Sequence, residues 1–589
     1  GVFMYQLTDE QEAFILADGK KILCACPGSG KTYIVARKVL NYLDKWTLNH
    51  QGMAVLSFTN VASQEIMNQL ESINENYRNV GYPHFVGTVD SFINTFIVLQ
   101  YGYLYNESRT RPQIALSDVW NYPFGYWRTE CHQKGCSNAI ENFYYGIDGK
   151  LYKNNSEVLC APNKGRKMPP CAQYKQIYEK KGIIFQSEVS TFAFRLLSEN
   201  PSIAQAIANR FPVILIDEAQ DTSEEQMAVF DLLFAAGVEK VFLVGDPDQS
   251  IYEWRNATPK CFVEKMQDEA WETLFLTANF RSSQNICDAV CHFSGTLDAQ
   301  KANIAKGSFA DEVQKPILLV YSKQTPQAEI YKYFIDKCKE MDVEMVPEKI
   351  AIVTRGRIHS DSDVSGLWKS AEIEMFARSA FEWNYGSRKK AYTLCELAMY
   401  SMNIGDLKNI QKIEEHVNQI LPYCDWKKCI IDIMVNAPSF ESAIGVWINQ
   451  FKVLLKQQLE TVNLSPRDGK EIDNIAKIKT RDAKVKDFKE KPIRIFFEKK
   501  NKENFTRSSI HGVKGETYDA VLLHVKSQTG STITPNLLKN GPLYSELMRI
   551  AYVGMTRPRR LLIVAMPGTV TKVDYPRFSK KNWEYVVLK

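Results

Sequence analysis

Residues 25–32 of this 589-residue chain read Ala25-Cys26-Pro27-Gly28-Ser29-Gly30-Lys31-Thr32. A short apolar run, Ile22-Leu23, comes before them, and residues 33–43 have the pattern of a helix. A strand, a glycine-containing loop that ends in Gly-Lys-Thr and a helix together form a cradle for a triphosphate, because loop amides and the helix N-terminus attract anionic oxygens. The consensus sequence of such phosphate-binding loops begins with glycine, and this chain has Ala25 at that position.

Each part of this loop has an expected role. Gly28 and Gly30 would let backbone N–H groups surround the phosphate oxygens, and Lys31 would reach the outer phosphates. The hydroxyl of Thr32 would ligate Mg²⁺. The alternative is a glycine-rich turn that merely ends in the same letters, and the flanking strand and helix patterns argue against it.

A second candidate site follows residues 211–216, a continuous apolar run that predicts a strand buried on both faces. The run leads into Asp217-Glu218-Ala219-Gln220-Asp221. Acidic residues at the carboxyl end of a parallel strand lie where such sheets bind ligands. Asp217 would hold Mg²⁺, and Glu218 would orient and deprotonate the attacking water. Taken alone, the acidic stretch could equally be the first turn of a helix.

A third apolar run, residues 240–245, also predicts a buried strand, and polar and aromatic residues follow it. Gln249 at the tip of this strand could sense a terminal phosphate or a water molecule. Tyr252 and Trp254 are suited to stacking on unpaired bases. Packing of the two rings in a core is the alternative, above all for Trp254.

Composition narrows the class of protein without naming the function. Apolar residues make up 45% and charged residues 24% of the chain, which is typical of a globular protein, and the net charge of +5 does not by itself indicate a nucleic-acid binder. The length predicts about three to five domains. The 13 cysteines lack a disulfide-like spacing and predict a cytoplasmic location. No apolar run approaches the ~18 residues of a membrane span, so no membrane partner is expected.

Four cysteines of one segment, Cys131, Cys136, Cys160 and Cys171, could bind Zn²⁺ through their thiolates. Their spacing lacks the Cys-x-x-Cys pairs of most zinc sites, so free thiols are the favoured interpretation.

A series of sequence blocks occurs in fixed order along nearly the whole chain. The blocks are residues 7–11, 25–32, 57–60, 87–92, 216–221, 245–252, 279–282, 511–516 and 551–557. In this order and with these residues the chain resembles a superfamily 1 helicase of the UvrD/Rep type. The resemblance implies an α/β fold with two RecA-like P-loop motor domains that have parallel sheets, each carrying a mainly helical insertion.

The resemblance and the motif spacing also predict domain limits. The first motor domain would comprise residues 1–97 and 200–282, with the insertion at 98–199. The second would comprise residues 283–358 and 491–589, with a helical insertion at 359–490.

The family's nucleotide contacts map onto matching positions of this chain. The resemblance implies that Gln11 reads the adenine edge and that Phe280 stacks on the adenine. The family's ribose-contacting acid is shifted by one residue here, which leaves Glu516 as its uncertain counterpart. The groups around the phosphates and Mg²⁺ would be Lys31, Thr32, Asp217, Glu218 and Gln249, and the arginine fingers would be Arg281 and Arg557.

The resemblance further implies contacts to single-stranded DNA. The residues that match the family's DNA contacts are Phe58, Asn60, Ser91, Tyr252, Trp254, Arg255 and His511. The function implied is an ATP-dependent DNA helicase or translocase that moves 3′→5′ on single-stranded or partly duplex DNA with Mg²⁺ and ATP.

An alternative function belongs to a different class. Compact UvrD-like chains resemble the helicase subunits of bacterial anti-phage systems such as Gabija, in which a nuclease is the partner. In this interpretation the chain is an ATP-gated DNA-binding or sensor subunit with little or no unwinding. A helicase–nuclease fusion and a small-molecule kinase fit the motifs less well.

Overall fold

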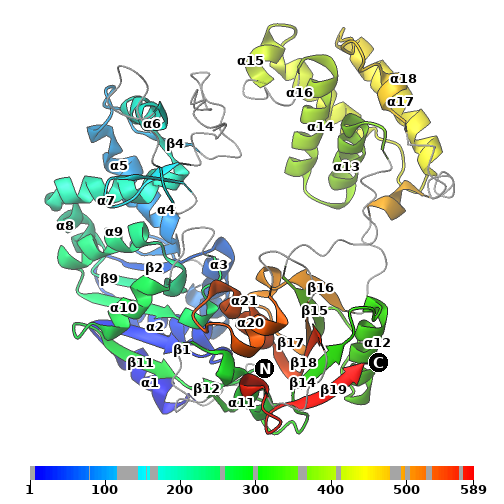
Figure 1. Cartoon of the computed structure of the whole chain (residues 1–589). Coiled ribbons are helices and arrows are strands. Elements are labelled where there is room, and N and C mark those ends of the chain that lie inside the picture. The colour runs from blue at the N-terminus through cyan, green and yellow to red at the C-terminus, as the bar shows by residue number, and fades with distance from the viewer. Residues whose placement is uncertain are drawn as a thin grey trace. The chain divides into compact units, whose positions relative to one another are not determined.

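The computed structural model describes residues 7–77, 80–115, 143–153, 156–158, 170–252, 259–295, 303–355, 368–405, 413–477, 492–497, 505–525, 533–568 and 575–588. The described chain divides into two compact units. One contains the residues up to 355 together with those from 505 to the C-terminus, and the other contains the described residues between 368 and 497 (Figure 1). Within the described residues, no helix combines the length and apolar character needed to cross a membrane.

The larger unit contains a parallel six-stranded sheet with the order β11-β1-β10-β9-β2-β3. The runs at 211–216 and 240–245 form buried strands, as predicted. The strand bounds are β1 (Lys20–Ala25), β2 (Met53–Ser57), β3 (Phe85–Thr88), β9 (Val213–Ile216), β10 (Lys240–Gly245) and β11 (Glu272–Leu276).

Helices cover both faces of this sheet, because successive strand side chains point to opposite sides. On one face Leu23 and Phe242 pack among α1, α2 and α3, and on the other Ile22 and Leu243 pack among α4 and α7–α10. We call this sheet and these helices the first lobe. The helix bounds are α1 (Asp9–Leu16), α2 (Lys31–Leu43), α3 (Asn60–Ile73), α4 (Val89–Ile93), α7 (Val189–Glu199), α8 (Pro201–Arg210), α9 (Glu224–Ala235) and α10 (Lys260–Gln267).

Short strands and one longer helix occupy the described part of the segment between α4 and α7. Strand β4 (Gln113–Ala115) pairs in parallel with β8 (Ile183–Phe185), and α6 (Pro170–Lys180) lies between them in sequence. The remaining elements are α5 (Leu99–Tyr101), β5 (Tyr144–Tyr145), β6 (Leu151–Lys153) and β7 (Ser156–Glu157). Helix α7 packs into the core of the first lobe, where Phe192 and Leu196 join Phe230 of α9.

A second parallel six-stranded sheet has the order β16-β15-β17-β18-β14-β19. The apolar runs of residues 316–321 and 350–353 form β14 and β15. This sheet and its helices form the second lobe. The bounds are β14 (Ile317–Tyr321), β15 (Ile350–Thr354), β16 (Thr506–Ser509), β17 (Tyr518–His524), β18 (Pro558–Pro567), β19 (Glu584–Leu588), α11 (Gln284–Val290), α12 (Gln327–Glu340), α20 (Pro535–Asn540) and α21 (Glu546–Met555). Two short strands, β12 (Ala278–Asn279) and β13 (Ile304–Ala305), pair with each other.

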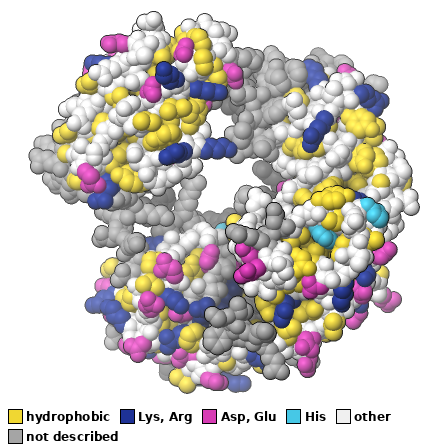
Figure 2. All heavy atoms as spheres, turned by 180° about the vertical axis from the view of Figure 1, so that it is seen from behind, with side chains coloured by type: hydrophobic (Ala, Val, Ile, Leu, Met, Phe, Trp, Pro, Cys, Tyr) yellow, Lys and Arg dark blue, Asp and Glu magenta, His cyan; other side chains and the backbone are white. Residues whose placement is uncertain are grey.

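The smaller unit is helical and has its own hydrophobic core around Trp426, Trp447 and Phe451. The longest of its helices is α17, which begins at Ile444. Val446 and Val453 of this helix are about half exposed. Figure 2 shows apolar side chains beside Lys and Arg at the surface of the protein. Its helices are α13 (Ala371–Tyr385), α14 (Arg388–Asn403), α15 (Ile413–Asn418), α16 (Tyr423–Val435), α17 (Ile444–Thr461) and α18 (Ile472–Ile475).

The predicted α/β fold with RecA-like domains is confirmed by the two parallel sheets and their helices. In the sequence, the helical unit is inserted between two segments of the second lobe. The predicted domain limits remain predictions.

We expect Trp447→Ala to unfold the helical unit selectively. The Trp447 ring is fully buried and stacks on Phe451 with centroids 4.8 Å apart, so its removal should cost roughly 3–5 kcal/mol. Hydrogen exchange followed by mass spectrometry should show lost protection in α13–α17 and unchanged protection in α1–α3. Val453→Ala, at an exposed position of the same helix, is the control, and equal protection in the two variants would contradict the expectation.

Candidate nucleotide site

The loop of residues 25–32 connects β1 to α2 and contains two glycines in the left-handed region. Gly28 has φ 77° and Gly30 has φ 76°, where other residues are strained. A Cβ on Gly28 would also lie 2.6 Å from Oδ1 of Asn279 and 2.7 Å from Cβ of Arg281. Glycine at position 28 therefore permits both the loop conformation and the close approach of the segment that carries Arg281.

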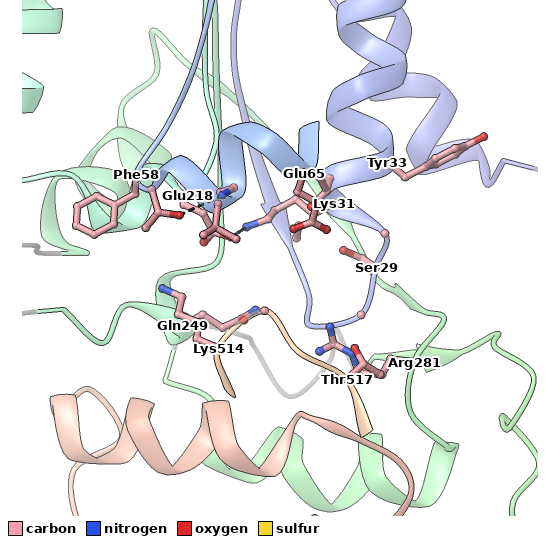
Figure 3. Close-up of a pocket in the computed structure, with 18 of the residues that line it drawn as sticks. Ser29, Lys31, Tyr33, Phe58, Glu65, Glu218, Gln249, Arg281, Lys514 and Thr517 are labelled. Atoms are coloured by element: carbon pink, nitrogen blue, oxygen red, sulfur yellow. Dashed lines mark hydrogen bonds and ion pairs between the residues drawn. The ribbon is translucent and has the colours of Figure 1, made fainter. Parts of the chain in front are cut away.

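Lys31 at the start of α2 lies among carboxylates from the end of β9. Its ammonium group pairs with Glu218, and its Nζ is 3.5 Å from Oδ1 of Asp217 (Figure 3). Burial alone would lower the pKa of Lys31, but the two carboxylates raise it above its ordinary value. Lys31 is therefore a fixed positive charge at the mouth of the loop.

The two carboxylates differ in their environment. Burial raises the pKa of Asp217 to about 6, although the charge of Lys31 opposes the shift. Burial acts on Glu218 in the same direction, but Lys31 and Lys514 outweigh it and lower the pKa of Glu218 to about 2. Glu218 also has φ 54°, a conformation uncommon for a residue with a side chain, and its carboxylate points toward Lys31 (Figure 3). Glu218 is thus ionised at neutral pH.

Two arginines lie close together on the opposite side of the site. Arg557 donates from Nη2 to Oε1 of Gln249 at 3.0 Å, and Arg281 donates from Nη1 to the carbonyl oxygen of Thr556 at 3.2 Å. Burial lowers the pKa of Arg557 to about 10. Burial and the neighbouring charge of Arg557 lower the pKa of Arg281 as well. Two neighbouring guanidinium groups are suited to binding an anion.

These groups surround one cavity of about 380 Å³ (Figure 3). Predicted site residues that line it are Ala25, Cys26, Gly28, Ser29, Gly30, Lys31, Thr32, Phe58, Glu218, Gln249, Tyr252, Arg281 and Arg557. Further lining residues that the sequence did not single out for this site are Tyr33, Thr59, Val61, Ala62, Glu65, Gln69, Asp221, Lys514, Gly515 and Thr517.

One helical face explains most of the lining residues that were missed. Val61, Ala62, Glu65 and Gln69 follow the 3.6-residue period along α3, directly after the 57–60 block. Applying this period from Val61 onward would have found Glu65 and Gln69. The carboxylate of Glu65 makes no hydrogen bond or ion pair among the described residues, and burial raises its pKa.

Some predicted nucleotide contacts lie beside the cavity instead of lining it. Gln11 is buried, accepts from the backbone N–H of Thr8 at 3.0 Å and donates to the carbonyl oxygen of Ser29 at 3.2 Å. Its amide therefore holds α1 against the phosphate loop. The backbone N–H of Phe280 donates to the carbonyl oxygen of Gly28 at 2.8 Å.

The segment after Lys514 presents Thr517, and not Glu516, to the cavity. Glu516 is exposed, whereas Thr517 lines the wall together with Gly515. Pro27 and Asp217 complete the loop and the strand end without lining the cavity. The roles of Gln11, Phe280 and Glu516 remain predictions.

Three of the predicted DNA contacts meet at the edge of this cavity. The Phe58 and Tyr252 rings stack with centroids 5.4 Å apart, and the His511 ring lies 6.2 Å from that of Tyr252. His511 is bonded through Nε2 to the carbonyl oxygen of Ile251 at 3.1 Å, and burial lowers its pKa. The aromatic group thus combines rings from the first and second lobes.

The other predicted DNA contacts are scattered. Asn60 is the exposed first residue of α3, and the Ser91 hydroxyl is bonded to the backbone of Thr88 at the start of α4. Trp254 and Arg255 lie outside the described residues. The side chains of the four cysteines considered for zinc, Cys131, Cys136, Cys160 and Cys171, also lie outside them.

Comparison with known proteins adds an independent observation. The UvrD/REP helicase N-terminal domain family matches residues 7–270. The chain is 25% identical over 426 residues to "Gabija protein GajB" of Bacillus cereus (strain VD045), covering 69% of this chain and 74% of that protein. It is 21% identical over 635 residues to "Probable DNA helicase II homolog" of Mycoplasma pneumoniae. That match covers 98% of this chain and 87% of the Mycoplasma protein. It is 24% identical over 296 residues to "DNA helicase II" of Haemophilus influenzae. That match covers 48% of this chain and 39% of the Haemophilus protein.

The motif order, the two parallel sheets and these matches agree with one another. Residues 7–270 thus match the UvrD/REP helicase N-terminal domain, and the chain as a whole is similar to UvrD-like DNA helicases.

Proposed function

We propose that this chain is a DNA helicase or translocase that hydrolyses Mg-ATP while it moves along single-stranded DNA. The observation that carries the proposal is the single cavity whose wall contains Lys31 and Glu218 of the first lobe and Arg557 of the second. A nucleotide in this cavity would bridge the lobes, and its hydrolysis would change how strongly they attract each other.

The residues around the cavity fit a triphosphate. Lys31, Arg281, Lys514 and Arg557 contribute positive charge to its wall. The Oγ of Ser29 is buried and has no hydrogen-bond partner in the described part of the chain, so it is available to an added oxygen. The first N–H groups of α2 have no acceptor inside the helix and are available as well.

Thr32 and Asp217 would hold Mg²⁺, whose charge would neutralise the phosphate oxygens. No group of three or more His, Cys, Asp or Glu side chains in the described chain is arranged to bind a metal ion. Mg²⁺ commonly takes most of its ligands from phosphate and water, so two protein ligands suffice.

Different side chains around the cavity would have different roles in ATP hydrolysis. A phosphate oxygen would replace Glu218 as the partner of Lys31, which would free the Glu218 carboxylate to orient a water molecule and accept its proton. Arg281 and Arg557 would stabilise the charge of the transferring phosphoryl group. Gln249 joins Arg557 to Asp246, because its Nε2 donates to Oδ2 of Asp246 at 2.6 Å. A terminal phosphate that contacts Gln249 would therefore alter its hydrogen bond with Arg557 of the second lobe.

Single-stranded DNA would stack on the aromatic group formed by Phe58, Tyr252 and His511. Stacking on ring faces is tolerant of sequence, which suits a protein that moves along any strand. Movement in the 3′→5′ direction is inferred from the family resemblance alone.

A second candidate function is supported by the likeness to Gabija protein GajB. The chain would then act as an ATP-gated DNA-binding subunit of an anti-phage complex with a nuclease partner. Unwinding of a labelled duplex with a single-stranded tail, measured beside ATP hydrolysis, separates the two functions. Strand separation supports the helicase, and DNA-stimulated hydrolysis without separation supports the gated subunit.

We expect Glu218→Gln to lower ATP hydrolysis by ~10²-fold or more while ATP still binds, because the change removes the base and leaves the phosphate loop intact. Steady-state turnover and titration with a fluorescent ATP analogue measure the two effects. Glu224→Gln, at the exposed start of α9, should behave as the unchanged protein. Near-normal turnover in Glu218→Gln would refute the assigned base.

We expect Phe58→Ala to weaken the binding of single-stranded DNA by about 1–3 kcal/mol, because one stacking face is lost. Fluorescence anisotropy of a labelled oligothymidylate without nucleotide measures the affinity. Tyr82→Ala, which removes a ring that is 78% exposed, serves as the control. Equal affinities for the Phe58 and Tyr82 variants would remove Phe58 from the DNA-binding surface.

A further inference from the structure

A carboxylate of helix α1 holds the segment that leaves the first sheet. Thr277 lies between β11 and β12, at the point where the chain passes from the sheet toward Arg281. Its backbone N–H donates to Oε2 of Glu10 at 2.8 Å, and its hydroxyl donates to Oε1 of the same carboxylate at 2.7 Å. Both oxygens of Glu10 are therefore bonded to one residue, and hydrogen bonds to an ionised carboxylate are stronger than those between neutral groups.

Helix α1 gives Glu10 a fixed position. Near its start, the side-chain amide of Gln11 donates to the carbonyl oxygen of Ser29 in the phosphate loop at 3.2 Å. Near its end, the buried ammonium group of Lys38 in α2 donates to the carbonyl oxygen of Ile15 at 2.9 Å. Because both ends of the helix are attached, the carboxylate of Glu10 is a fixed acceptor and not the tip of a free surface side chain.

The segment that follows Thr277 lies against the phosphate loop. The backbone N–H of Phe280 donates to the carbonyl oxygen of Gly28 at 2.8 Å. The Oδ1 of Asn279 accepts from the backbone N–H of Arg281, also at 2.8 Å. Arg281 then lines the nucleotide cavity. Since only a few residues separate Thr277 from Arg281, a shift at Thr277 would move the guanidinium group.

The position of Arg281 is one that requires support. Burial and the charge of Arg557 both lower the pKa of Arg281, because neither a buried site nor a like charge favours an ionised guanidinium group. Repulsion between the two groups therefore favours movement of Arg281 away from the cavity. The hydrogen bonds from Thr277 to Glu10 oppose this movement, because they fix the start of the segment.

We propose that Glu10 is a positioning residue for nucleotide binding, which holds the 277–281 segment on the phosphate loop and so keeps Arg281 at the cavity. Glu10 is not among the residues that line the cavity, so it acts through Arg281 and not by touching a nucleotide. The inference rests on the proposed function, since it requires that the cavity bind ATP.

The first test measures the affinity of the full chain for a fluorescent ATP analogue without DNA. Glu10→Ala should weaken binding by about tenfold, the usual loss when a hydrogen bond to a charged group is removed. Glu10→Gln keeps an acceptor for the N–H of Thr277 and can donate to its hydroxyl, so it should retain most of the affinity. Glu12→Ala, at an exposed position of the same helix, is the control and should bind as the unchanged protein does.

A double variant separates the positioning of Arg281 from general support of the fold. Arg281→Ala removes the group through which Glu10 acts and should itself weaken binding. Glu10→Ala should then have little further effect in the Arg281→Ala background, whereas a loss of fold support would lower the affinity equally in both backgrounds. An equal loss in both backgrounds would overturn the inference.

Hydrogen exchange followed by mass spectrometry measures the segment directly, in the absence of nucleotide. Glu10→Ala should speed the exchange of the backbone amides of residues 277–282 and leave that of α9 unchanged. Exchange of residues 277–282 at the rate of the unchanged protein would overturn the inference. Should Glu10→Ala fail to fold, Thr277→Val, which removes only the hydroxyl donor, provides the same comparisons.

The two proposals fail in different ways. An unchanged protein that does not bind the ATP analogue would overturn the proposed function, and the inference with it. An unchanged protein that binds the analogue no more tightly than Glu10→Ala does would overturn the inference alone. A loss of affinity in Glu10→Gln as large as that in Glu10→Ala would also count against the inference.

Discussion

The charge balance between Lys31 and the carboxylates of Asp217 and Glu218 is the constraint around which the site is organised. Asp217 is buried and Lys31 and Glu218 are partly buried, so their charges tolerate one another only while they remain close. Parallel pairing puts the carboxyl ends of β1, β9 and β10 at the same edge of the first sheet, so residues far apart in the chain meet there. Removing Lys31 would leave two neighbouring carboxylates without their shared counter-charge.

This constraint also explains why the second lobe is needed. The first lobe alone supplies a lysine that is already neutralised by its own acids. Arg557, carried by the segment between α21 and β18, adds the excess positive charge that favours a polyphosphate. The contacts of Arg557 with Gln249 and of Lys514 with Asp221 both cross between the lobes, so polar contacts link the two lobes at the cavity.

Local patterns predicted much of the fold and the centre of the site. The buried strands appear in the sequence as apolar runs. The loop of residues 25–32 was recognisable because glycine, lysine and threonine each have a distinct role at a fixed spacing in phosphate-binding loops. The pairing of Lys514 with Asp221 was not predictable in this way, since 293 residues separate them and neither belongs to a local pattern that indicates the other. The hydrogen bond from Gln11 to Ser29 likewise depends on how α1 packs, and Thr517 lines the cavity because of the local turn of the chain after Gly515.

The neighbouring guanidinium groups of Arg281 and Arg557 have a consequence for the cycle of the motor. The charge of Arg557 lowers the pKa of Arg281, so the two guanidinium groups repel each other. An anion between them releases that repulsion, and departure of the anion restores it. Under the proposed function, loss of the product anion would restore this repulsion and would favour movement of the segments that carry Arg281 and Arg557 away from each other.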